Sequence, residues 1–351
     1  MRKLWIYIVV TLATLVTWVG CDVHEFPDMP ETAALCLRLN YDTDMTVWEH
    51  IYEDYEVKEQ GYGITYDNHL DYGKIRYIVH AYPVVDRQRA TVQEPTHKFV
   101  FTKDVARGYD HEEVIELPAG QYNIMVWSDM VKMSGDEYFY NATDFAEIFL
   151  QGDHRGSTDH RDAFRGSNQV VITTTVVDLA PDTLDITMQR PLAKYEIQTT
   201  DLKEFIDKEY EFLEKEAATR GETSTVRVNT DDYKVVFFYP GYMPNAYNMH
   251  IDKPVDSKLN VLFDSKLKIL SDNEASLGFD YVFVNGNNAA VTVQVGLYDK
   301  EGRQKALSDP INLPLHRSYH SILRGSFLLR QATGGIEIDP EFDGDITIRI
   351  D

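Results

Sequence analysis

The chain has 351 residues, of which 43% are hydrophobic and 12% aromatic, and this composition supplies enough apolar surface for packed cores and excludes a wholly disordered chain. Its 57 acidic residues outnumber its 34 basic ones, and the net charge of −23 excludes nucleic acid as a partner because phosphates would be repelled. After a leader at residues 1–20, the length predicts two domains, at 21–189 and 190–351.

The N-terminal segment has the layout of a signal peptide. Arg2 and Lys3 precede an apolar run at residues 4–19, and Gly20 is the small residue that a peptidase needs beside its cut. The run of 16 residues would span about 24 Å as a helix, slightly less than the roughly 30 Å hydrocarbon core of a bilayer. A cleaved leader is therefore favoured over a retained transmembrane helix.

The residue after the leader, Cys21, predicts a lipid anchor. A small residue followed by Cys is the pattern of a bacterial lipobox, in which the thiol is alkylated by a lipid before the leader is cut off between Gly20 and Cys21. Trp18 departs from the pattern, because Leu is usual there. A retained helix and an ordinary secreted protein are the alternatives. Cys36 then has no disulfide partner and is expected as a small side chain on a strand.

The rest of the chain is dominated by apolar residues that alternate with polar ones, which is the periodicity of half-buried strands. Short strands at this density indicate an all-β fold of two β-sandwiches. The expected strands lie at 74–82, 121–129, 183–189, 193–199, 233–239, 279–284, 290–299 and 345–350.

One helix is expected at residues 200–221, inserted in the second domain and packed on a sheet. Asp201 followed by Glu204 resembles a capping box, and Gly221 can end the helix. An apolar stripe with helical spacing is formed by Leu202, Phe205, Ile206 and Leu213.

Catalytic motifs are absent from the sequence. It contains no HExxH, no GxSxG, no P-loop and no GxGxxG before a helix, so it predicts neither an enzyme nor a cofactor. The loop at 151–169 offers weak candidates for metal ligands, although Asp/His-rich loops are usually only hydrated. These candidates are Asp153, His154, Asp159 and His160.

Several stretches together resemble a known family. Residues 116–129, "ELPAGQYNIMVWSD", resemble the fimbrial anchor subunits of the Bacteroidales, the FimB-type and Mfa-type lipoproteins, in which a turn with Gly leads into a strand that ends in Trp and an acidic residue. The segments 189–197, 318–329 and 334–350 resemble the same proteins in the same order. Trp18 and the long acidic helix depart from the family pattern.

The resemblance implies two transthyretin-like β-sandwich domains and a place at the base of a type V pilus on the outer membrane surface. Its partners would be stalk or accessory subunits, bound by β-strand addition, and the membrane, reached through covalent lipid. An anchor keeps its N-terminus, so cleavage at Arg38 is not expected and the first strand would be retained. The residues of that strand are Leu35, Leu37 and Leu39.

The terminal strand is the candidate for strand exchange. Ile346, Ile348 and Ile350 share one face, and the strand is expected either to complete the second domain or to be donated to a neighbouring subunit. An accessory or tip subunit is the alternative within the fimbrial class. A surface glycan-binding lipoprotein is the alternative outside it, because Tyr and Trp side chains can stack on sugars.

Overall fold

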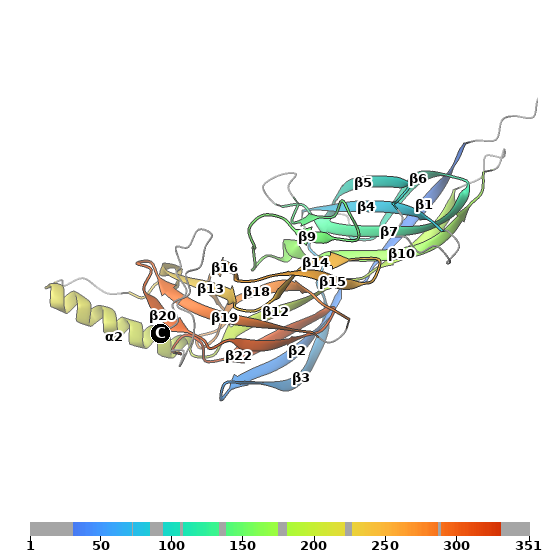
Figure 1. Ribbon diagram of the computed structural model, residues 1–351. Helices are drawn as coiled ribbons and strands as arrows, with labels where there is room; N and C mark the ends of the chain where they lie inside the picture. Colours follow the sequence, from blue (N-terminus) through green and yellow to red (C-terminus); the bar gives the residue numbers. More distant parts are fainter. Residues whose placement is uncertain are drawn as a thin grey trace, which may run out of the picture.

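The computed structural model describes residues 31–71, 73–84, 94–105, 108–132, 138–174, 181–221, 227–286 and 289–330. Within these ranges the fold consists of two β-sandwiches that are joined by a further, four-stranded sheet (Figure 1). The prediction of an all-β fold with one conspicuous helix is confirmed. The predicted strands up to residue 299 are present, whereas the terminal one at 345–350 lies outside the described residues.

The first sandwich packs a three-stranded sheet against a four-stranded one. The strand order of the first sheet is β11 (Asp182–Met188), β1 (Thr32–Tyr41) and β6 (His111–Pro118). The order of the second is β10 (Ala163–Ile172), β7 (Gly120–Met130), β4 (Lys74–Pro83) and β5 (His97–Asp104). Between them lie alternate apolar side chains of the inner faces, including Leu35, Leu37, Tyr77, Ile124 and Val126.

The second sandwich is larger. One sheet has the order β17 (Lys268–Ile269), β18 (Ala275–Phe283), β12 (Leu192–Thr199), β22 (Tyr319–Gly325), β2 (Asp44–Glu53) and β3 (Glu56–Asp67). The facing sheet has the order β16 (Val261–Ser265), β13 (Tyr233–Tyr239), β19 (Ala289–Asp299) and β20 (Gln304–Leu307), with β21 (Ile311–Leu315) also paired to β19. Their core includes Ile197, Phe237, Leu277 and Val293.

The chain passes between the two sandwiches more often than the sequence suggested. After β1 it crosses to the second sandwich, where β2 pairs in parallel with β22, so that Thr46 lies opposite Tyr319. It then returns to the first sandwich for β4 to β7, β10 and β11. The domain boundary near residue 190 stays a prediction, but it does not account for residues 44–67, which belong to a sheet of the second sandwich.

A four-stranded bridging sheet is built from both halves of the chain. Its order is β15 (Lys253–Lys258), β14 (Met243–Asn248), β9 (Ile148–Leu150) and β8 (Tyr140–Asn141). Phe149 of β9 lies opposite Ala246 of β14. A third apolar cluster joins residues of both sandwiches, such as Trp127 of β7 and Phe283 of β18, with Phe145 and with Tyr247 of β14. The two sandwiches are therefore packed against each other.

The expected helix is present as α2 (Leu202–Arg220), and two 3-10 turns, η2 (Asp159–Arg161) and η3 (Thr230–Asp232), accompany it. Leu202 and Phe205 are buried, and α2 projects from the end of the second sandwich (Figure 1). Gly221 ends the helix in the left-handed conformation with φ 74°, as expected, and its N–H is bonded to the last-turn carbonyl oxygens.

The predicted capping box is wrong. The side chain of Asp201 makes no cap hydrogen bond to the helix. Its carboxylate instead accepts hydrogen bonds from the backbone N–H groups of Leu328 (3.3 Å) and Leu329 (3.1 Å). The Asp201 carboxylate therefore makes a tertiary contact with residues 328–329, in place of the helix cap that the local pattern predicted.

Candidate functional site

The Asp/His-rich loop serves as a structural contact between the sandwiches. His154 Nε2 lies 2.6 Å from the Oδ2 atom of Asp280 on β18, and Asp280 also pairs with Arg161. Burial alone raises the pKa of the Asp280 carboxyl, but the charges of Arg161 and His154 outweigh this effect and hold that pKa below its usual value. The loop is thus joined to the second sandwich through a buried, ionised carboxylate.

The other metal candidates are not gathered at one site in the described part of the chain. Asp159 accepts hydrogen bonds from Lys194 Nζ (2.7 Å) and from the Tyr281 hydroxyl (2.8 Å). Asp153 is exposed, and His160 is buried in the η2 turn. Across the described ranges, no group of three or more His, Cys, Asp or Glu side chains is arranged to hold a metal ion.

Beside this loop, the two connections between the sandwiches are joined by one arginine. Arg190, between β11 and β12, donates from Nε to both carboxylate oxygens of Asp162, at 3.0 and 2.9 Å. Its Nη1 atom donates to the backbone oxygen of Asp44 (3.1 Å), which starts β2. Arg190 is fully buried and Asp162 is 2% exposed. The pair therefore fixes the strands that cross between the sandwiches relative to each other.

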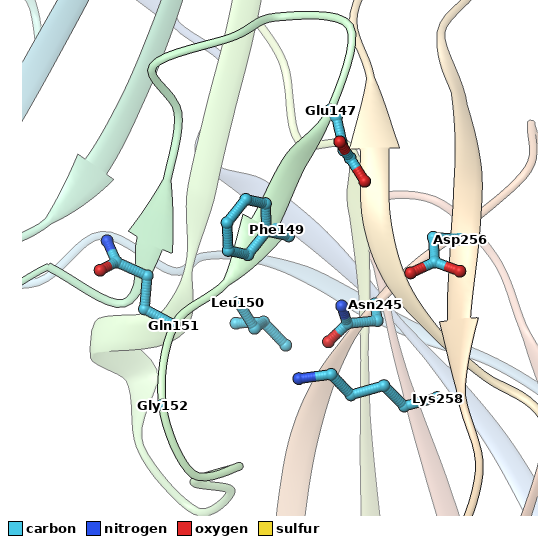
Figure 2. A pocket seen from close by; sticks show the side chains of 8 residues that line it. All are labelled: Glu147, Phe149, Leu150, Gln151, Gly152, Asn245, Asp256 and Lys258. Carbon is cyan, nitrogen blue, oxygen red and sulfur yellow. The ribbon is translucent and has the colours of Figure 1, made fainter.

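A cleft opens on the bridging sheet (Figure 2). It has a volume of about 440 Å³ and lies between the β9 segment and strands β14 and β15. Such clefts occur preferentially where domains meet. The lining side chains are Glu147, Phe149, Leu150, Gln151, Asn245, Asp256 and Lys258, with Gly152 completing the wall.

The polar groups in the cleft come from opposite walls. Asp256 and Lys258 lie on β15, Asn245 lies on β14, and the Lys258 ammonium group points back toward the β9 side (Figure 2). Neither Asp256 nor Lys258 has an ion pair to another described side chain within 4.0 Å. The cleft thus presents an aromatic ring, amides, carboxylates and one ammonium group to solvent.

Sequence reasoning did not identify this cleft. The strand β9 has only three residues, and no period can be recognised over so short a stretch. Its partner β14, and β15 beyond it, follow β9 by about a hundred positions, so the proximity of these strands is a consequence of the tertiary fold. The predicted lipid-attachment residue Cys21, its neighbour Gly20 and the strand-exchange residues Ile346, Ile348 and Ile350 lie outside the described residues. No helix in the described part of the chain is long and apolar enough to cross a membrane.

Comparison with known proteins gives one strong match and several distant ones. The model of a family of unknown function (DUF6562) matches residues 30–351. The fimbrial anchor protein Mfa2 from Porphyromonas gingivalis has a TM-score of 0.38 and 11% identity, with 79% of this chain and 82% of that chain covered. No curated protein sequence matches the chain.

Two further solved structures come from Bacteroides thetaiotaomicron VPI-5482. A candidate polysaccharide-binding protein (DUF1812) has a TM-score of 0.41 and 11% identity, with 78% of each chain covered. A candidate adhesin has a TM-score of 0.40 and 9% identity, with 81% of each chain covered. These scores mark a distant likeness.

Proposed function

Because this chain belongs to the DUF6562 family, whose function is unknown, we propose a role from its own sequence and structure: a lipid-anchored fimbrial subunit that catalyses no reaction. The most specific form of this proposal is the anchor at the pilus base, on the surface of the outer membrane. Other subunits would bind it by β-strand addition. The proposal starts from the lipobox-like Val19-Gly20-Cys21 and from the motifs that resemble fimbrial anchor subunits.

The structural observation that carries the proposal is strand β1. It is the central strand of its sheet, paired with β11 on one side and β6 on the other. Leu35 and Leu37 are fully buried and Leu39 is 1% exposed. Removing such a strand by cleavage at Arg38 would open the core, so the first sandwich stays closed only in a subunit that keeps its N-terminus. A subunit that keeps its N-terminus also keeps any lipid on Cys21.

The position of β1 also fits a tether. The strand begins with Thr32, and the start of β1 is at the end of the first sandwich that is distant from α2 (Figure 1). The 10 residues between Cys21 and Thr32 can reach at most roughly 35 Å. A lipid on Cys21 would therefore hold the first sandwich near the membrane and leave the second sandwich directed away from it, toward other subunits.

An exposed sheet edge in the second sandwich could accept a partner strand. Strand β3 is the outermost strand of its sheet, and on its outer side no other described strand is paired with it. Tyr62 is 64% exposed and Ile64 is 86% exposed. Charged residues occupy the first half of β3, where they discourage pairing, whereas residues 61–65 carry no charge. This second half supports binding by strand addition.

Isolation of fimbriae tests the proposal. Fimbriae released from the membrane with detergent should carry this protein with them, and immunogold labelling should place it at the cell-proximal end. Labelling at the distal end would favour the accessory or tip alternative. Absence of the protein from detergent-released fimbriae would contradict a fimbrial role.

A further inference from the structure

We propose that the cleft between β9 and β15 binds a short, uncharged saccharide. This inference does not depend on the fimbrial role, because it follows from the residues that line the cleft. The volume of about 440 Å³ falls within the range of roughly 300–1,000 Å³ that is usual for small-ligand sites.

The hydrogen-bonding groups of the cleft match those of a sugar. Adjacent hydroxyl groups on a sugar ring each donate one hydrogen bond and accept others. The carboxylates of Glu147 and Asp256 can only accept, while the ammonium group of Lys258 can only donate. The amides of Gln151 and Asn245 do both. Acceptors and donors therefore line the same cleft, as a ring of neighbouring hydroxyls requires. Figure 2 draws Glu147, Asn245, Asp256 and Lys258 around one space, whereas the Gln151 amide points away from β14 and β15.

One aromatic ring complements these groups. Phe149 lines the cleft and is half-buried, so one part of its ring packs on the protein while the rest is accessible. The C–H groups on one face of a sugar ring carry partial positive charge and pack on the electron-rich face of an aromatic ring. The accessible part of the Phe149 ring can therefore pack on the C–H face of a sugar, and a ligand without such an apolar face would leave it unused.

The charges in the cleft select against anionic ligands. Two carboxylates and one ammonium group leave the lining with a net negative charge. The chain as a whole carries −23, so sulfated, phosphorylated or uronic acid glycans would be repelled. An uncharged saccharide satisfies the polar groups without this penalty.

The cleft is largely formed before any ligand arrives. Phe149 is fixed by the pairing of β9 with β14, and Asn245 and Leu150 are each 8% exposed. The segment that follows β9 is held by the contact between His154 and Asp280. Few side chains would have to become ordered on binding, which lowers the entropic cost of association.

Saturation-transfer NMR on the full mature chain tests this proposal. The probes are glucose, galactose, mannose and N-acetylglucosamine, each titrated to ~50 mM, with glucuronic acid as the anionic comparison. At least one neutral sugar should receive saturation at its ring C–H protons, and glucuronic acid should receive less. If none of the four neutral sugars receives saturation, the proposal is overturned.

Variants then locate the binding. Asp256→Asn and Lys258→Gln change exposed groups on β15 and should leave the fold intact. Each should nevertheless lower the affinity for the sugar about tenfold or more. Phe149→Ala should abolish the signal. Tyr62→Ala, which removes an exposed aromatic ring on β3, is the matched control and should bind as the wild type. Unchanged binding by both β15 variants, or loss of binding in Tyr62→Ala, would contradict a site in this cleft.

Discussion

Arg190 and Asp162 form a buried ion pair at the point where the chain crosses between the two sandwiches. Nε of Arg190 lies 3.0 and 2.9 Å from the two carboxylate oxygens of Asp162. The guanidinium group also stacks over the Phe164 ring, 4.6 Å from its centroid. Because each charge is removed from water, each depends on the other. The relative position of the sandwiches is thus sensitive to this pair.

Arg190→Met should therefore be strongly destabilising. It leaves the Asp162 carboxylate buried without its cation, and loss of one partner of a buried pair costs about 3–5 kcal/mol. Urea unfolding followed by fluorescence measures the change. The double variant Arg190→Met with Asp162→Leu should recover much of this loss, because neither charge is then buried.

An exposed pair provides the control for this experiment. Arg38 is paired with Glu112 at 2.7 Å, but both side chains are about half exposed. Arg38→Gln should leave the urea midpoint unchanged, because solvent screens exposed pairs. If Arg190→Met and Arg38→Gln had equal effects, the buried pair would not have the role described.

Because His80 is buried and neutral, the fold should lose stability in mild acid. Its side chain is buried, with its ring stacked on Phe145 at 3.9 Å between centroids. Burial lowers the pKa of His80 to about 4. The unfolded chain binds this proton from roughly pH 6.5 downward, whereas the folded chain does not until about pH 4. The contribution of neutral His80 to the free energy of unfolding is therefore complete above about pH 6.5, and it is lost as the pH falls toward 4.

The variant His80→Phe isolates this contribution. Phe can keep the stacking on Phe145 but cannot bind a proton. The free energy of unfolding of the wild type, relative to the variant, should fall by about 3 kcal/mol between roughly pH 6.5 and pH 4. Urea unfolding over this pH range is the measurement. Parallel pH profiles for the two proteins would show that His80 is not held neutral by the fold.

Strand β1 predicts different effects for neighbouring residues. Leu37 is fully buried, whereas Cys36 faces the other side of the sheet and is half-buried. Leu37→Ala should cost about 2–5 kcal/mol of unfolding free energy because it leaves a cavity in the core. Cys36→Ala should change it little. Equal losses in thermal or urea unfolding would mean that β1 does not present the face described.

Substitution of Asp201 should affect the backbone near residues 328–329 more than the helix α2 that Asp201 precedes. Asp201→Ala removes the acceptor for the Leu328 and Leu329 amides. Hydrogen exchange at these two amides should therefore accelerate, while exchange in the middle of α2 should stay close to that of the wild type. Faster exchange confined to the first turn of α2 would instead indicate that Asp201 caps the helix, as the sequence suggested.

The sequence predicted strands from runs of apolar residues with a period of two. Strands β7 and β19 are where they were expected, although each is buried on one face only at its start and on both faces along the rest of its length. Strand β3 was not foreseen, because it is an edge strand exposed on both faces and so lacks apolar alternation. Its partner β2 contains two register shifts, between Thr46 and Trp48 and between Glu49 and His50, which disturb the period of two.

The chemistry of the polar residues was harder to predict than the fold. His154 and Asp159 resembled metal ligands in the sequence, yet their partners Asp280 and Lys194 lie on strands that follow much later in the chain. The motif of Trp followed by Asp in β7 has a local explanation: the Trp127 indole N–H donates to Asp129 (3.1 Å). Asp129 also pairs with Arg76 of β4 (2.8 Å), which the motif alone did not reveal.

The most direct test of the central claim is metabolic labelling with a clickable fatty acid in cells that produce either the wild type or Cys21→Ala. If Cys21 carries the lipid, the wild type should be labelled and the variant should not. The variant should also be missing from the outer surface, and any fimbriae that still assemble should appear in the medium. Equal label on the two proteins, or fimbriae bound equally to both kinds of cell, would contradict a lipid-anchored subunit.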